Sequence, residues 1–208
     1  MKNVPADQQE RRSRILETTR EQLAKFGYDG INMRDLAVAA DVATTTLYNQ
    51  YKSKDALVLA AMQEALDDLR GRLQVDLRGI DRFIARREIV ADQIVVNPTY
   101  SQAVITILFA AAPSDEIVRI LISATISGVR ELLRDLERNG SLIDGVDINK
   151  VALHITASNY ATILMWMKGF IALHDFKEDF VNAGLYVLKA VLKPGSRELE
   201  QVNARLAG

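Results

Sequence analysis

Short hydroxyl, amide and ammonium side chains gather between positions 41 and 57, in the stretch DVATTTLYNQYKSKDAL. Thr44, Thr45 and Thr46 follow one another directly, although threonine is a mediocre helix former because its branched Cβ restricts the side chain. Hydroxyls of this kind can hydrogen-bond phosphates or base edges, and threonine methyl groups can contact thymine. The chemistry that this stretch indicates is therefore recognition of a nucleic acid.

Residue types that carry most catalytic and metal chemistry are absent or unsuitably spaced. The chain has no cysteine, which excludes disulfides, thiol catalysis and cysteine-ligated metals. Its two histidines, His154 and His174, lie far apart in the sequence without matching carboxylates, so we expect no metal site. No paired carboxylates, phosphate-binding loop or nucleophile constellation is evident. The sequence thus predicts neither an enzyme nor a bound cofactor.

Composition indicates a globular, mostly helical chain. Of its 208 residues 49% are hydrophobic, and only 4 are proline and 11 glycine. Residues 1–60 hold nine Lys and Arg against eight Asp and Glu, so a nucleic-acid surface must use locally placed charge. The N-terminus lacks a signal-peptide core, and the apolar stretch 151–174 is interrupted by His154, Asn159 and Lys168. We therefore expect a cytoplasmic protein without a membrane span.

Residues that typically start or end helices divide the first part of the chain into helical segments. We expect one from Gln8 to Phe26, ended by Gly27, with an inward face of Ile15, Leu16, Thr19, Leu23 and Phe26. Asn32 can cap a second over 33–40, and Asp35 suits its positive start. A third covers about 44–51, and Ser53 caps a fourth to about Leu77, where Gly79 breaks it.

The second and third of these helices have the skeleton of a helix-turn-helix. Ala37 is small enough for the helix crossing, and Asp41 stands at the turn, where aspartate tolerates positive φ better than most residues. Leu36, Ala40 and Leu47 face inward. The third helix then presents Thr44, Thr45, Tyr48 and Asn49 outward. Because Ala43 cannot cap, Thr44 is left as either the helix cap or a base contact.

Residues 26–57 resemble the DNA-binding domain of the TetR family of bacterial transcriptional repressors. Thr46-Leu47-Tyr48, Tyr51 and Ser53-Lys54-Asp55 match the family pattern position by position, whereas Asp41 and Gln50 depart from its usual glycine and aromatic residue. The resemblance implies an all-α homodimer. It implies an N-terminal three-helix helix-turn-helix domain, residues 1–55, and a larger C-terminal helical ligand-binding and dimerisation domain, residues 56–208.

The function that this resemblance implies is binding of a palindromic double-stranded DNA operator and release by a small, apolar or aromatic inducer. The expected DNA-binding residues are Asn32, Arg34, Thr44, Thr45, Thr46, Tyr48, Asn49 and Lys54. Activation instead of repression stays open. So does a helical ligand-binding or enzymatic protein that keeps its N-terminal unit as a scaffold.

The expected helices of the second domain lie near 81–96, 98–111, 115–139, 147–173 and 176–192. The last two helices are apolar nearly all round, so two faces of each must be buried. This favours burial of one face in the chain's own core and of the other against a second copy of the chain. A single-chain core is the alternative. Arg82, Arg86 and Arg87 are interpreted as a solvated helix face.

Aromatic, sulfur-bearing and hydroxyl side chains in this domain are the candidates for an inducer pocket, because adaptable methionines beside aromatics suit an apolar ligand. Ordinary packing is the alternative for each. The candidates are Tyr100, Phe109, Thr125, Tyr160, Met165, Trp166, Met167 and Phe170.

Overall fold

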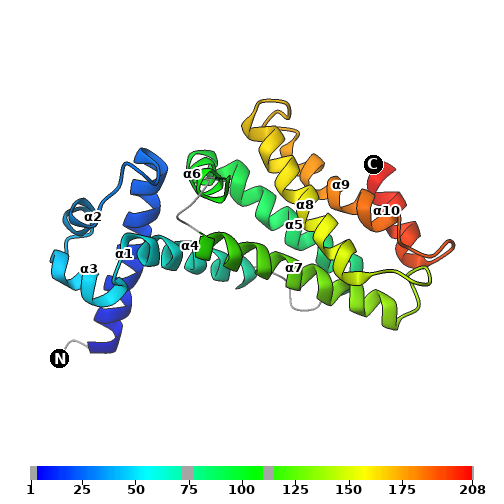
Figure 1. The fold of residues 1–208 in the computed structure, drawn as a ribbon, viewed down its shortest axis with the longest axis horizontal. Helices are drawn as coiled ribbons and strands as arrows, with labels where there is room; N and C mark the ends of the chain where they lie inside the picture. The colour runs from blue at the N-terminus through cyan, green and yellow to red at the C-terminus, as the bar shows by residue number, and fades with distance from the viewer. Residues whose placement is uncertain (1–3, 72–76, 110–114, 208) are drawn as a thin grey trace. The chain divides into compact units, whose positions relative to one another are not determined.

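A computed structural model describes residues 4–71, 77–109 and 115–207, which form ten α-helices. They are labelled in Figure 1 as α1 (Val4–Phe26), α2 (Met33–Ala39), α3 (Thr44–Tyr51), α4 (Lys54–Gly71), α5 (Gly79–Val96), α6 (Pro98–Phe109), α7 (Asp115–Arg138), α8 (Ile148–Met167), α9 (Phe176–Lys189) and α10 (Arg197–Ala207). Within these ranges, β structure is limited to an isolated antiparallel bridge between Leu142 and Leu192. The predicted all-α fold is confirmed.

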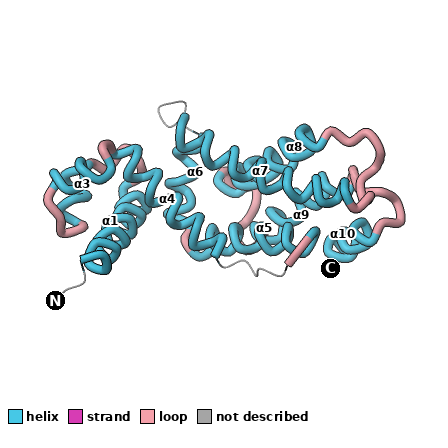
Figure 2. The backbone as a smooth tube through the Cα atoms, turned by 90° about the horizontal axis from the view of Figure 1, so that it is seen from below, coloured by secondary structure: helices cyan, strands magenta, loops and turns pink. Residues whose placement is uncertain are grey.

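The chain divides into two compact units. Unit 1 comprises Met1–Gly71 and Asn97–Val118, and unit 2 comprises Arg72–Val96 and Arg119–Gly208. In unit 1, α2, α4 and α6 pack against α1. In unit 2, α9 packs against α8, α5 and α10, and Figure 2 shows α5 and α9 side by side. The functional division expected at residue 55 stays a prediction.

Helix α1 provides the buried face on which unit 1 is built. Ile15, Leu16, Thr19 and Leu23 are buried as expected, but Phe26, also expected to face inward, is 49% exposed. Phe26 is the last residue of α1, where the helix no longer holds its side chain over the core. Gly27 follows with φ +68° and donates its N–H to the Leu23 carbonyl at 2.9 Å, which ends the helix as predicted.

Two boundaries around the middle of the chain differ from expectation. Helix α4 ends at Gly71 and not near Leu77. Gly79, expected to break a helix, begins α5 with φ +55°. The predicted end of α6 at residue 111 lies outside the described residues.

Helix α8 begins as predicted and ends early. The Asp147 side chain accepts hydrogen bonds from the backbone N–H groups of Asn149 and Lys150, at 3.0 and 3.1 Å. The helix ends at Met167 and not near Leu173, because Gly169 takes φ +76° and donates to the Trp166 carbonyl at 2.9 Å. Helix α9 likewise ends at Lys189, before Leu192, and α10 was not predicted.

The apolar residues of α9 face the interior of unit 2. Val181, Leu185 and Leu188 are fully buried in a core shared with Ile155 of α8. These residues of α9 are thus covered by the chain itself, so the expectation that they need a second copy of the chain as a cover was wrong. For α8 a second copy as cover stays a prediction, and Leu153 and Leu164 are exposed in the single chain. None of the helices described is long and apolar enough to cross a membrane.

Candidate nucleic-acid interface

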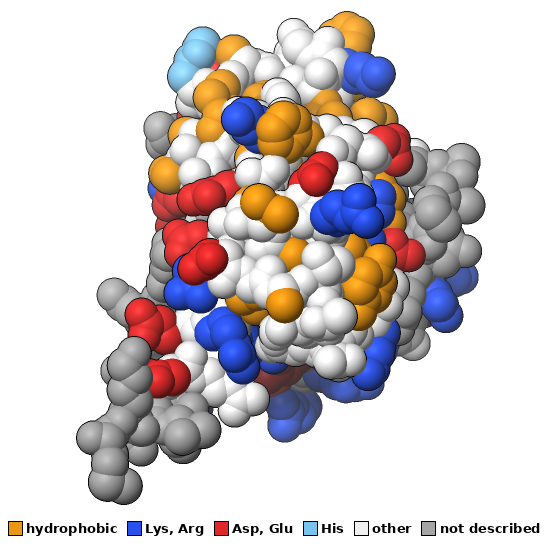
Figure 3. All heavy atoms as spheres, turned by 90° about the vertical axis from the view of Figure 1, so that its left-hand side faces the viewer, with side chains coloured by type: hydrophobic (Ala, Val, Ile, Leu, Met, Phe, Trp, Pro, Cys, Tyr) orange, Lys and Arg blue, Asp and Glu red, His pale blue; other side chains and the backbone are white. Residues whose placement is uncertain are grey.

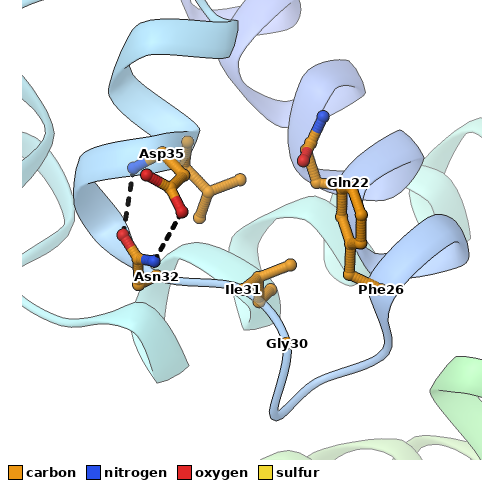
Figure 4. A pocket seen from close by; sticks show the side chains of 7 residues that line it. Gln22, Phe26, Gly30, Ile31, Asn32 and Asp35 are labelled. Atoms are coloured by element: carbon orange, nitrogen blue, oxygen red, sulfur yellow. Dashed lines mark hydrogen bonds between the residues drawn. The ribbon is translucent and has the colours of Figure 1, made fainter.

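Asn32 holds the start of α2. Its side-chain Oδ1 accepts hydrogen bonds from the backbone N–H groups of Arg34 and Asp35, both at 3.0 Å. Its Nδ2 donates in return to Asp35 Oδ2 at 2.7 Å (Figure 4). Two N–H groups that the helix leaves unsatisfied are thereby paired. Asn32 is therefore the cap that was predicted, and Arg34, the next candidate for DNA contact, is exposed beside it.

The turn between α2 and α3 has the predicted geometry. Asp41 takes the left-handed conformation with φ +53°. The N–H groups of Ala40 and Val42 donate to the carbonyls of Leu36 and Ala37, both at 2.9 Å. Ala37 is buried at the crossing, where a larger side chain would separate the two helices.

Helix α3 begins at Thr44, with Ala43 as its N-cap and no capping hydrogen bond from a side chain. Thr46 donates its N–H to the Ala43 carbonyl at 2.8 Å. The open question about Thr44 is thus answered in one part, because Thr44 is the first helical residue and not the cap. Its half-buried side chain remains a candidate for a base or phosphate contact.

The two faces of α3 differ sharply in burial. Leu47 and Tyr51 are buried and anchor the helix to unit 1. Thr45, Tyr48 and Asn49 are exposed, and Thr46 is half-buried. The outer face therefore presents hydroxyl, phenol and amide groups, which can donate to phosphates and exchange hydrogen bonds with base edges.

Charge in the part of the chain that carries α2 and α3 is mixed. Figure 3 shows Lys and Arg side chains interspersed with Asp and Glu on the visible face. This agrees with the near-neutral balance of residues 1–60. Any phosphate contact must therefore come from individually placed groups.

The start of α4 is tied to the loop after α1. Lys54 Nζ donates to the Tyr28 carbonyl at 3.0 Å and lies 4.1 Å from the centroid of the Tyr28 ring. The Tyr28 hydroxyl donates to Asp55 Oδ1. Burial and the neighbouring Asp55 carboxylate raise the pKa of Tyr28, so its hydroxyl stays protonated as the donor. Ser53 caps α4 as predicted, accepting from the Ala56 N–H at 3.1 Å.

Lys52, between α3 and α4, has a strained backbone. Its φ and ψ are 67° and −41°, and the Ser53 N–H donates to the Tyr51 carbonyl at 2.8 Å. A hydrogen bond across three residues with positive φ at the centre is a γ-turn of the rare form. Helices α3 and α4 are thus joined by a single tight turn.

Two arginines of α1 brace this unit, and sequence reasoning missed both. Arg14 Nε donates to the Ala40 carbonyl at 3.1 Å, and Arg20 Nη1 pairs with Glu64 Oε2 at 2.9 Å. Their partners lie 26 and 44 residues away, so no local pattern points to them.

A small hollow of about 120 Å³ lies between α1 and α2. It is lined by Gln22, Phe26, Gly30, Ile31, Asn32, Asp35 and Leu36 (Figure 4). Pockets for drug-sized ligands start at about 300 Å³. The hollow is therefore too small for the expected inducer.

The candidate inducer residues do not form one group. Tyr100 and Phe109 lie on α6 in unit 1, and burial raises the pKa of Tyr100 to about 12. Thr125 of α7 and Tyr160 of α8 are neighbours in unit 2, where burial raises the pKa of Tyr160 and the Thr125 side chain lowers it. Trp166 is buried, with its ring centroid 5.3 Å from that of Phe176.

The remaining candidates lie nearer the surface of unit 2. Met165 and Phe170 are exposed, and Met167 is half-buried. Within the described part of the chain, no group of three His, Asp or Glu side chains could hold a metal ion.

Residues 15–61 match the family model described as bacterial regulatory proteins, tetR family. The HTH-type transcriptional repressor KstR of Rhodococcus jostii is 31% identical over 126 residues, which cover 55% of this chain and 57% of that protein. KstR of Mycolicibacterium smegmatis is 46% identical over 55 residues, 26% of this chain and 27% of the relative. The chain thus spans about half the length of the first relative and a quarter of the second.

Solved structures share the fold over most of the chain. A putative TetR-family regulator from Syntrophomonas wolfei has a TM-score of 0.73 at 18% identity, covering 91% of this chain and 100% of that one. The fatty acid degradation regulator FadR from Bacillus halodurans has a TM-score of 0.71 at 16% identity, covering 89% and 99%. Residues 15–61, which include α2 and α3, are thus similar to the tetR family of bacterial regulatory proteins.

Proposed function

We propose that this protein is a transcriptional repressor that binds a palindromic DNA operator as a homodimer and is released by a small, largely apolar ligand. The observation that carries the proposal is the geometry of α3. Its buried residues fix it on unit 1, while Thr45, Tyr48 and Asn49 are presented outward after a well-formed turn. A helix held in this way can enter the major groove with its first turns against the bases.

Repression is favoured over activation by the relatives. The KstR proteins of Rhodococcus jostii and Mycolicibacterium smegmatis are transcriptional repressors, and they are 31% and 46% identical to this chain over 126 and 55 residues. In the proposed mode of DNA binding, the bases are contacted by Thr44, Thr45 and Asn49. The phosphates are contacted by Arg34, Thr46, Tyr48 and Lys54. Asn32 acts indirectly, by holding the start of α2.

A homodimer is supported by the outer face of α8. Leu153 and Leu164 are 53% and 37% exposed, and both lie on one stripe, because eleven residues span just over three helical turns. Tyr186 of α9 is also exposed, at 61%. Exposed apolar side chains on two neighbouring helices suit a second copy of the same surface.

The proposed ligand acts by changing the spacing of the two recognition helices, which are the α3 helices of the two protomers. A dimer reads two half-sites only when their separation matches the DNA repeat, so a ligand that favours another spacing releases the operator. In unit 2, the pair Tyr160 and Thr125 supports a pocket with some polar character.

The test is selection of DNA from the gene's own promoter region by the purified protein, followed by binding measurements on the selected site. We expect a palindromic site, and Tyr48→Phe should weaken binding about fivefold through the loss of one hydrogen bond. Thr106→Val, which removes an exposed hydroxyl of α6, is the control. If no DNA is selected while ligand binding is intact, the chain is a ligand-binding or enzymatic protein with a scaffold N-terminus.

A further inference from the structure

Arg87 of α5 is buried, where the sequence had suggested a solvated arginine face. It is 5% exposed. Its Nε donates to the Phe180 carbonyl of α9 at 3.2 Å, and Nη2 donates to the same oxygen. The guanidinium carbon lies 5.2 Å from the Phe83 ring centroid and 4.8 Å from that of Phe180. The charge is thus enclosed by aromatic side chains.

The guanidinium lies directly on the backbone of α9. A Cβ atom at Gly184 would come within 2.5 Å of the Arg87 Cζ and 2.6 Å of Nη1. Glycine at this position therefore leaves the space that the guanidinium occupies. Arg87 and Gly184 form a matched pair across α5 and α9.

Among the residues that the structure describes, no carboxylate pairs with the positive charge of Arg87. Among the described residues, Nη1 has no hydrogen-bond partner, and burial is the cause that lowers the pKa of Arg87, to about 9. The side chain nevertheless remains charged at neutral pH. Burying an unpaired charge is costly, and native proteins rarely do so without a functional reason.

Other polar atoms of unit 2 are also left unsatisfied. Arg130 Nε on α7, Asn159 Oδ1 on α8 and Asn182 Oδ1 on α9 are buried without a partner among the described residues. Beside Arg87, by contrast, the surroundings are apolar. The Phe180 ring stacks on the Phe176 ring at a centroid distance of 5.4 Å, and the Trp166 ring centroid lies 5.3 Å from that of Phe176. This combination suits a ligand with one anionic end and an apolar body.

We propose that Arg87 is the recognition site for a carboxylate group of the ligand of unit 2, which is then an apolar carboxylic acid. The inference rests on the proposed ligand-responsive function and specifies its ligand class. One carboxylate oxygen accepts from Nη1, and the aromatic row contacts the apolar body. Because the side chains are packed, the acid enters only as its neighbours move, which links binding to the packing of α5 on α9.

The test compares acids with neutral analogues in the absence of DNA. Octanoate and phenylbutyrate, with octanol and phenylbutanol as matched controls, are titrated into the full chain by calorimetry, with melting temperature as a second readout. We expect at least one acid to bind, and its alcohol to bind about 10- to 100-fold more weakly, as for a hydrogen bond to a charged group. Equal binding of acid and alcohol, or no binding of either acid, overturns the proposal.

Arg87→Met tests the residue itself, and Arg82→Met, an exposed arginine on the same helix, is its control. We expect Arg87→Met to lose the preference for acid over alcohol and Arg82→Met to keep it. A purely structural arginine would change the melting temperature and leave that preference intact, which contradicts the proposal. If Arg87→Met does not fold, Arg87→Lys retains the charge, and the comparison of acid with alcohol on the wild type still decides.

Operator binding measured without ligand separates this inference from the proposed function. Selection of an operator together with equal binding of acids and alcohols would overturn the carboxylate site alone. Acid binding through Arg87 without any operator would overturn repression alone.

Discussion

Lys54 contacts Tyr28 twice, by a hydrogen bond of 3.0 Å from Nζ to the Tyr28 carbonyl and by its position 4.1 Å from the Tyr28 ring centroid. Tyr28 in turn donates its hydroxyl to Asp55. These contacts join the loop after α1 to the first turn of α4. Since an ammonium group has three N–H donors, the carbonyl uses one of them and two can still reach a phosphate.

Lys54→Ala should weaken operator binding and lower its dependence on salt. If Lys54 neutralises one phosphate, the slope of log affinity against log salt falls in magnitude by about 1. Fluorescence anisotropy over a range of salt concentrations measures it, with the exposed Lys150→Ala in unit 2 as control. An unchanged slope with weaker binding would assign Lys54 to holding Tyr28 and not to DNA.

The helix-turn-helix could be predicted from the sequence because its determinants are local. Asn32 caps α2 within three residues, Asp41 meets the conformational demand of the turn, and Leu47 falls on the inward face of α3. Each of these features depends on neighbours along the chain. The starts of α2 and α3 therefore followed from the sequence, whereas α1 begins at Val4, before the expected Gln8.

What could not be predicted depends on contacts between distant residues. Arg87 looks like any arginine on a charged helix face, and only the packing of α5 on α9, with Gly184 opposite, encloses it. Phe26 fits the apolar face of α1 by periodicity, yet it lies at the helix end and is exposed. Helix α10 is short, and its one fully buried residue, Val202, gives little periodic signal.

Asn32→Ala should destabilise unit 1, because two backbone N–H groups at the start of α2 lose their acceptor. The expected loss in the free energy of unfolding is about 1 kcal/mol. Denaturant titration followed by circular dichroism measures it, and Asn32→Ser, which can still cap, is the control. Equal stability of the alanine and serine variants would show that the cap contributes nothing.

Asp41 combines a left-handed backbone with a negative charge near the proposed DNA surface. Asp41→Ala should lower the free energy of unfolding by about 1 kcal/mol, because a residue without a short polar side chain fits positive φ poorly. Asp41→Asn tolerates the same backbone and removes the charge. It should keep the stability and tighten operator binding about threefold at low salt. Anisotropy and denaturation together measure both effects, and tighter binding by the alanine variant alone would rule out the charge as its cause.

Leu153→Asp should convert the proposed homodimer into a monomer. Leu153 is 53% exposed in the single chain, on the same stripe of α8 as Leu164, so in the dimer its carboxylate replacement would be buried without a partner. Sedimentation velocity measures the change in mass, and Leu153→Met, which keeps the apolar surface, should stay dimeric. Because two half-sites require two recognition helices, the monomer should also lose most of its affinity for the palindromic operator. A variant that stays dimeric with unchanged operator binding would place the interface away from this face of α8.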